Sequence, residues 1–145
     1  MTTMTEQTTQ VYSLFIRATP EQVWDAITKP EFTQQYFYGV RIELRDGRRF
    51  SAMRDVEWDE DVFEADPPRR LVHQWVSAYD PDMAAEEPSR VTWEIEPQDG
   101  GITKLTVVHD RLERAPKTAE SVAGGWMLVL SGLKTLLETG EPLAG

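Results

Sequence analysis

Three side chains in this sequence have the chemistry for proton transfer or for polar recognition of a ligand. His73 lies in the run RLVHQWVSAY, His109 ends the run ITKLTVVH, and Glu64 lies in WDEDVFEA. An imidazole whose pKa is near neutrality can act as a general acid or base. An inward Glu64 carboxylate needs a donor such as Arg90 or Arg70. The histidines are also consistent with a hydrogen-bonded core role, and Glu64 with a place on the solvated convex face, so the sequence leaves both roles open.

Other kinds of catalytic chemistry lack their motifs. The chain has two histidines and no cysteine, and it contains no H-E-x-x-H spacing for a metal. The segment VLSGL is not a G-x-S-x-G nucleophile elbow, and there is no glycine-rich phosphate loop. We therefore assign no catalytic residue and predict neither a metal site nor a cofactor.

Aromatic side chains point to binding more than to catalysis. Tryptophan and tyrosine combine apolar area with a hydrogen-bonding group, which suits amphipathic ligands. The same rings are equally consistent with filling a thick core. The predicted ligand-binding residues, with both tyrosines expected at the entrance, are Tyr36, Tyr38, Trp58, Phe63, Trp75, Trp93, His109, Trp126, Val129, Leu130 and Leu133.

Seven β-rich runs must position these side chains. Turn signals separate them, among them Asp46-Gly47, Pro67-Pro68 and the loop 80–89, which predicts a meandering antiparallel sheet. Side chains along a strand point alternately to the two faces of the sheet, which places Trp93 and His109 on the faces that carry apolar residues. The same rule does not decide the orientation of His73. The runs are VYSLFIRA, VRIEL, RRFSAM, WDEDVFEA, RLVHQWVSAY, RVTWEIE and ITKLTVVH.

Charged residues in the strands and turns are expected to face water. Most acidic residues of WDEDVFEA, Glu60 among them, are predicted on the solvated convex face of the sheet. The doublets Arg48-Arg49 and Arg69-Arg70 are predicted to be solvated turn residues rather than a basic patch.

Three helices are predicted around the strands. The segment Thr19-Pro20-Glu21-Gln22 has the residues of a capping box, and the helix it begins should end before Pro30. A second short helix is expected at about 30–35. The third begins after Pro116 with Thr118 as the expected cap and ends at Gly140, which gives it a length of about 30 Å.

The last helix contains three interior glycines, Gly124, Gly125 and Gly132. Each costs about 1 kcal/mol relative to alanine, and a helical net places them on the side that should face the sheet. Two compatible explanations remain. The missing side chains let the helix approach a curved sheet, or they leave space for a ligand cavity roofed by Trp126.

Length and charge limit the remaining alternatives. The 145 residues suit one domain, predicted at 11–140 between a disordered lead, 1–10, and a short tail, 141–145. A net charge of −10 disfavours nucleic acid and anionic membranes as partners, and no apolar run has the length of a membrane span. The lead lacks the pattern of a targeting peptide, so we predict a cytoplasmic protein.

Several segments in fixed order resemble the family named for the activator of heat-shock protein 90 ATPase homologues, within the START-like or SRPBCC superfamily. They are ATPEQVWDAIT, VFEADPPRRLVHQW, SRVTWEIEP, LTVVHD, and GGW followed by LSGLKTLLETG. The resemblance implies an α+β helix-grip fold, in which a curved antiparallel sheet surrounds a long C-terminal helix and leaves a cavity between them. The segment between Tyr38 and Trp58 is shorter than this family leads us to expect.

The resemblance implies three functions. The first is binding of a hydrophobic or aromatic small molecule, such as a lipid or a polyketide, without covalent chemistry. The second is catalysis like that of polyketide cyclases and aromatases, with His73, His109 or Glu64 moving protons. The third is a chaperone co-factor role, and either a monomer or a homodimer is expected.

Overall fold

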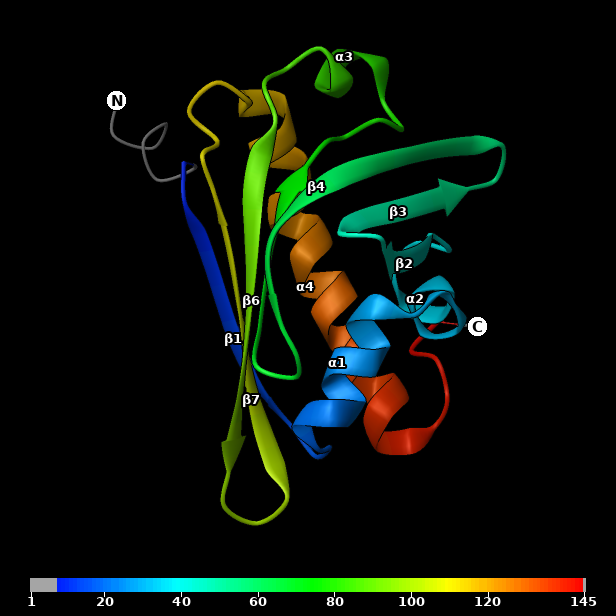
Figure 1. Cartoon of the computed structure of the whole chain (residues 1–145), viewed down its shortest axis with the longest axis vertical. Helices are drawn as coiled ribbons and strands as arrows, with labels where there is room; N and C mark the ends of the chain where they lie inside the picture. Colours follow the sequence, from blue (N-terminus) through cyan, green and yellow to red (C-terminus); the bar gives the residue numbers. More distant parts are fainter. Residues whose placement is uncertain (1–7, 145) are drawn as a thin grey trace.

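The computed structural model describes residues 8–144, so residues 1–7 of the predicted lead and residue 145 of the predicted tail lie outside the described residues. One antiparallel sheet of seven strands, in the order β1-β7-β6-β5-β4-β3-β2, supports the long helix α4 (Pro116–Thr139). Figure 1 shows β2, β3 and β4 bending away from the plane of the other strands, which curves the sheet around α4. This confirms the predicted α+β architecture.

All seven predicted runs are strands, with some changed ends. RLVHQWVSAY leaves the sheet at Trp75, well before its predicted end, and a short helix, α3 (Pro81–Ala84), occupies part of the predicted loop. Gln10, placed by the sequence in the lead, is the first residue of β1, and the domain division remains a prediction. The strands are β1 (Gln10–Ile16), β2 (Arg41–Arg45), β3 (Arg48–Met53), β4 (Val56–Asp66), β5 (Arg70–Trp75), β6 (Ser89–Gln98) and β7 (Ile102–Asp110).

Helix α1 (Pro20–Thr28) begins as predicted. The Gln22 amide donates to Thr19 Oγ1 at 3.1 Å, and the Thr19 amide donates to Gln22 Oε1 at 2.8 Å, which completes the capping box. The helix ends before Pro30, where α2 (Pro30–Tyr36) begins. No helix among residues 8–144 is both long and apolar enough to cross a membrane.

The start of α4 differs from the prediction that Thr118 is its cap. The N-cap position is Ala115, whose side chain cannot accept a hydrogen bond. The free backbone amides of the first turn instead donate to a carboxylate from a distant part of the chain. Glu86, in the loop after α3, accepts hydrogen bonds from the amides of Lys117 and Thr118 at 2.9 Å and from Thr118 Oγ1 at 2.8 Å. The predicted C-terminal residue, Gly140, is confirmed, with a left-handed φ of 80°.

The three helix glycines have three different environments. A Cβ at Gly132 would lie 3.1 Å from Tyr36 Cβ, so this glycine permits close packing against α2 rather than against the sheet. A Cβ at Gly125 would lie 3.6 Å from the Tyr38 hydroxyl. Gly124 is exposed and a Cβ there would meet nothing within 4 Å, so the prediction that it faces the sheet is wrong.

Alanine at two of these glycines should separate helix propensity from packing. Gly124→Ala gains helix propensity in open space, and we expect it to raise the free energy of unfolding by up to about 1 kcal/mol. Gly132→Ala gains the same propensity but forces α4 and α2 apart, so we expect a net loss of about 1 kcal/mol. Urea denaturation of both variants checks this, and equal stabilisation of the two would contradict the packing role of Gly132.

Candidate functional site

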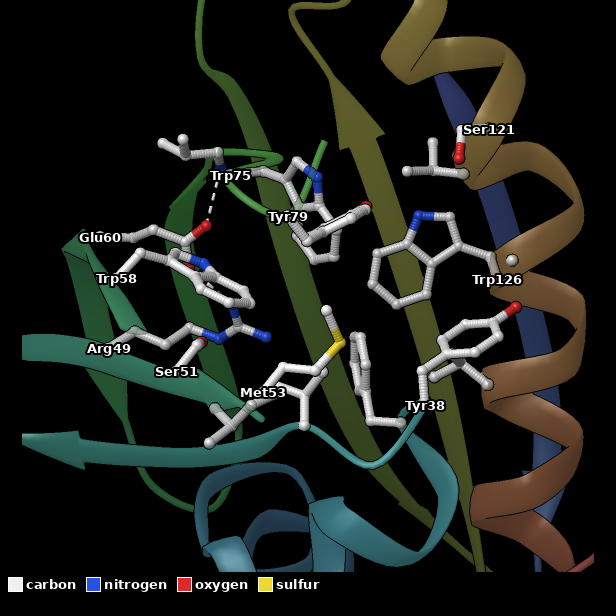
Figure 2. A pocket seen from close by; sticks show the side chains of 17 residues that line it. Tyr38, Arg49, Ser51, Met53, Trp58, Glu60, Trp75, Tyr79, Ser121 and Trp126 are labelled. Atoms are coloured by element: carbon white, nitrogen blue, oxygen red, sulfur yellow. Dashed lines mark hydrogen bonds and ion pairs between the residues drawn. The ribbon is translucent and has the colours of Figure 1, made fainter. Parts of the chain in front are cut away.

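A cavity of about 380 Å³ lies between the N-terminal half of α4 and the curved half of the sheet (Figure 2). Its size is within the range of small-molecule sites. Most of the side chains around it are apolar or aromatic, and they come from the α2–β2 loop, β2, β3, β4, the end of β5 and α4. The lining residues are Phe37, Tyr38, Val40, Ile42, Arg49, Ser51, Met53, Trp58, Glu60, Trp75, Val76, Tyr79, Ser121, Val122, Gly125, Trp126 and Val129.

The mouth of this cavity is marked by its exposed lining residues, Tyr38, Tyr79 and Ser121. Tyr38 has a left-handed φ of 54° and precedes Gly39 at 75°, so the chain turns sharply there and presents the ring to solvent. Gly125 faces the Tyr38 hydroxyl and has no side chain to close the gap. The mouth therefore lies between the α2–β2 loop, the segment that follows β5, and α4.

Five of the eleven predicted ligand-binding residues line the cavity: Tyr38, Trp58, Trp75, Trp126 and Val129. The other six do not; they are Tyr36, Phe63, Trp93, His109, Leu130 and Leu133.

Two of these six are placed elsewhere for clear reasons. Tyr36 was expected at the entrance, but it is buried and its hydroxyl donates to the Ala26 carbonyl at 2.7 Å. Phe63 is 51% exposed, because it is out of phase with the inward residues Trp58 and Glu60 on β4.

Both histidines are buried and each accepts a hydrogen bond from an indole. Trp93 Nε1 donates to His73 Nε2, and Trp126 Nε1 donates to His109 Nδ1, both at 3.0 Å. The remaining ring nitrogens contact the Gln74 carbonyl and Ser89 Oγ at 2.8 Å. Because an indole only donates, the nitrogen that accepts from it carries no proton, and both rings are neutral.

Burial is the main reason why these imidazoles stay neutral. It lowers the pKa of His109 to about 3 and the pKa of His73 well below its usual range, and the nearby Arg49 charge lowers the pKa of His73 further. Neither histidine lines the cavity. Their contacts are those of hydrogen-bonded core residues.

Glu64 also lies away from the cavity. Its side chain is 44% exposed, and Arg70 Nε donates to Glu64 Oε1 at 3.1 Å. The inward orientation that the sequence left open is therefore not adopted, although Arg70 is one of the two donors considered for it.

The cavity wall contains a buried ion pair that was not predicted from the sequence. Arg49 and Glu60 were predicted to be solvated, yet their side chains are 3% and 0% exposed. Arg49 Nη1 donates to Glu60 Oε1 at 2.6 Å, and the Val76 amide donates to Glu60 Oε2 at 2.7 Å. Burial raises the pKa of the Glu60 carboxyl, while Arg49 and the Val76 amide act in the opposite direction.

The strand register explains the pairing. Arg49 of β3 is directly opposite Glu60 of β4, and Ser51 is opposite Trp58. Trp58 and Glu60 are two residues apart on one strand, so their side chains lie on the same face of the sheet. This spacing was the signal in the sequence that could have predicted the burial of Glu60.

Two polar atoms beside this pair have no hydrogen-bond partner among the described residues. They are Ser51 Oγ and Trp58 Nε1, both buried, and both side chains line the cavity. An unsatisfied buried group of this kind costs about 1–3 kcal/mol. One end of the cavity thus carries polar groups, while the walls toward α4 are mostly apolar.

The chain resembles known proteins over most of its length. The family described as Activator of Hsp90 ATPase homolog 1-like protein matches residues 17–138. No curated protein matches the sequence.

Among the described residues, no cluster of three or more histidine, aspartate or glutamate side chains is arranged to hold a metal ion.

Three solved structures illustrate the shared fold. A conserved protein of unknown function from Enterococcus faecalis is 19% identical with a TM-score of 0.74, over 91% of this chain and 72% of that one. CalU16 from Micromonospora echinospora is 24% identical with a TM-score of 0.70, over 94% and 77%. The Aha1 dimer from Colwellia psychrerythraea is 16% identical with a TM-score of 0.71, over 91% and 97%.

Proposed function

This chain belongs to the family of Activator of Hsp90 ATPase homolog 1-like proteins, and we propose that it binds a hydrophobic or aromatic small molecule in the cavity beside α4. The observation that carries the proposal is an open cavity of about 380 Å³ with three tryptophans, Trp58, Trp75 and Trp126, in its walls. Burying an apolar ligand there gains about 25 cal/mol for each Å² removed from water.

A binding role without covalent chemistry fits the side chains of the cavity. Both histidines are neutral and already hydrogen-bonded in the core, and Glu60 is occupied by Arg49 and the Val76 amide. No observation on the cavity favours the cyclase-like alternative. A chaperone partner, a dimer and a cytoplasmic location stay predictions.

The proposal is tested first by native mass spectrometry of the freshly purified protein, which would reveal a small molecule that copurifies. A titration with 2-ethylnaphthalene, followed by ¹⁵N–¹H NMR, then measures a Kd and locates the contacts. We expect the indole signals of the three cavity tryptophans to shift together. If no naphthalene shifts any cavity signal and no molecule copurifies, the proposed function is wrong.

Two neighbouring glycines offer a matched pair of variants. Gly125→Leu places a side chain against Tyr38 at the mouth, so we expect the Kd for 2-ethylnaphthalene to rise at least about tenfold. Gly124→Leu adds the same side chain to the same helix in open space, and we expect the wild-type Kd. Equal affinities of the two variants would show that the ligand does not enter past Tyr38.

A further inference from the structure

The cavity has two chemically different ends, and this difference carries information about its ligand. The wall toward α4 consists of side chains such as Val122, Trp126 and Val129, whereas the opposite wall holds Arg49, Ser51 and Glu60. Figure 2 shows this polar group on β3 and β4, across the cavity from Trp126. A ligand that fills the space contacts both ends.

Arg49 offers a donor to whatever occupies the cavity. One terminal nitrogen, Nη1, is bound to Glu60 at 2.6 Å, and Figure 2 shows the other terminal nitrogen pointing into the cavity. Among the described residues no hydrogen bond is formed by that second nitrogen. The guanidinium is held in place by the rings of Phe37 and Trp75, whose centroids lie 5.9 and 5.6 Å from its carbon.

Two more donors lie beside it. Ser51 is two residues from Arg49 on the same face of β3, and Trp58 is the cross-strand partner of Ser51, so the three side chains are immediate neighbours. Within residues 8–144, Ser51 Oγ and Trp58 Nε1 have no hydrogen-bond partner. Indole and guanidinium groups donate and never accept, and a serine hydroxyl can do either. The set is therefore complementary to an oxygen acceptor.

The charge of that acceptor follows from Glu60. The cation of Arg49 is already neutralised by a buried carboxylate at 2.6 Å, so a second carboxylate from a ligand would leave an uncompensated negative charge in the cavity wall. A neutral carbonyl accepts from the same donors without that cost. It has no hydrogen-bond donor of its own, so it leaves no new group unsatisfied.

We propose that the ligand is an aromatic or polycyclic ketone, whose neutral carbonyl oxygen binds at Arg49, Ser51 and Trp58 while its rings lie against Trp126. This inference rests on the proposed function, because it specifies the class of molecule that the cavity takes. It assigns Arg49 to recognition and Glu60 to positioning and neutralising it.

Three probes that differ in one group provide the test. They are 2-acetylnaphthalene, which has a carbonyl, 2-ethylnaphthalene, which lacks it, and 2-naphthoate, which carries a charge. In ¹⁵N–¹H NMR titrations of the full chain we expect the ketone to bind at least about tenfold more tightly than the other two probes. The Trp58 indole signal should move most with the ketone.

Variants of the polar wall then locate the effect. Arg49→Lys keeps a cation for Glu60 but has no second nitrogen, and we expect it to reduce the preference for the ketone over 2-ethylnaphthalene to less than about threefold. Trp58→Phe and Ser51→Ala leave the ion pair intact and should each lower the preference. Ser121→Ala, on the α4 side of the cavity, is the matched control and should retain it.

The outcomes are distinguishable. Equal Kd values for ketone and hydrocarbon, or tightest binding of the naphthoate, would overturn the carbonyl assignment and leave the proposed function standing. A ketone preference that survives in Arg49→Lys, Trp58→Phe and Ser51→Ala would also overturn it. Failure of all three probes to bind would reject this inference, and it would reject the proposed function as well if no small molecule copurifies with the protein.

Discussion

Arg49→Met is expected to lower the free energy of unfolding by about 3–5 kcal/mol at pH 7. The substitution removes the cation and leaves the Glu60 carboxylate buried at 0% exposure, with only the Val76 amide as a partner. The measurement is urea denaturation followed by circular dichroism, with wild type and variant compared at the same pH.

The same variant makes a prediction about pH. Burial already raises the folded-state pKa of Glu60, and the loss of Arg49 removes an influence that lowers it. Because the folded-state pKa of Glu60 is above its unfolded-state pKa, the ionised carboxylate destabilises the folded state fully at pH values above the folded-state pKa. This destabilisation disappears as the pH falls below the unfolded-state pKa of about 4.3. The deficit of Arg49→Met relative to wild type should therefore be smaller at pH 5 than at pH 7.

A double variant supplies the control. In Arg49→Met with Glu60→Gln the charge is gone while the amide oxygen still accepts from Val76, so more than half of the lost stability should return. If the double variant is no more stable than Arg49→Met, the cost does not come from an unpaired charge.

The wild-type protein should lose about 2 kcal/mol of stability per buried histidine between pH 7 and pH 5. The folded-state pKa of His109 is about 3, and that of His73 is also far below the unfolded value of about 6.5. The folded state therefore binds fewer protons than the unfolded state. The contribution of the two histidines to stability is complete above pH 6.5 and decreases as the pH falls. Charging either ring also breaks its hydrogen bond from an indole.

Glutamine variants test this assignment. His109→Gln keeps an acceptor for Trp126 and a donor for Ser89 but does not titrate in this range, so the decrease between pH 7 and pH 5 should fall by about half. His73→Gln should remove a similar share, and the two together most of it. An unchanged pH dependence in both single variants would mean that the rings are already protonated or exposed.

Local patterns were the part of this protein that its sequence predicted well. The capping box at Thr19 and Gln22, the exact span of β3 and the end of α4 at Gly140 depend on residues close together in the chain. The sheet followed from alternation and turn residues, which are equally local.

Contacts between distant residues were the part that could not be predicted. The capping of α4 by Glu86 spans more than thirty residues, and the burial of Arg49 requires the register that places it opposite Glu60. Charged residues in a strand are usually solvated, so composition gave the wrong environment for both members of the pair. The cavity tryptophans were predicted from their chemistry as large amphipathic rings, and the same criterion included Phe63, which is exposed.

The carboxylate of Glu86 has a consequence for the speed at which a ligand enters and leaves. Tyr79 precedes the segment that carries Glu86, and Ser121 lies one turn after the amides that Glu86 binds. Three hydrogen bonds therefore join the two segments on which these mouth residues lie. We expect a widening of the mouth on this side to require breaking these bonds. We therefore expect that weakening these bonds would shorten the residence time of a molecule bound in the cavity while its contacts inside the cavity stay the same.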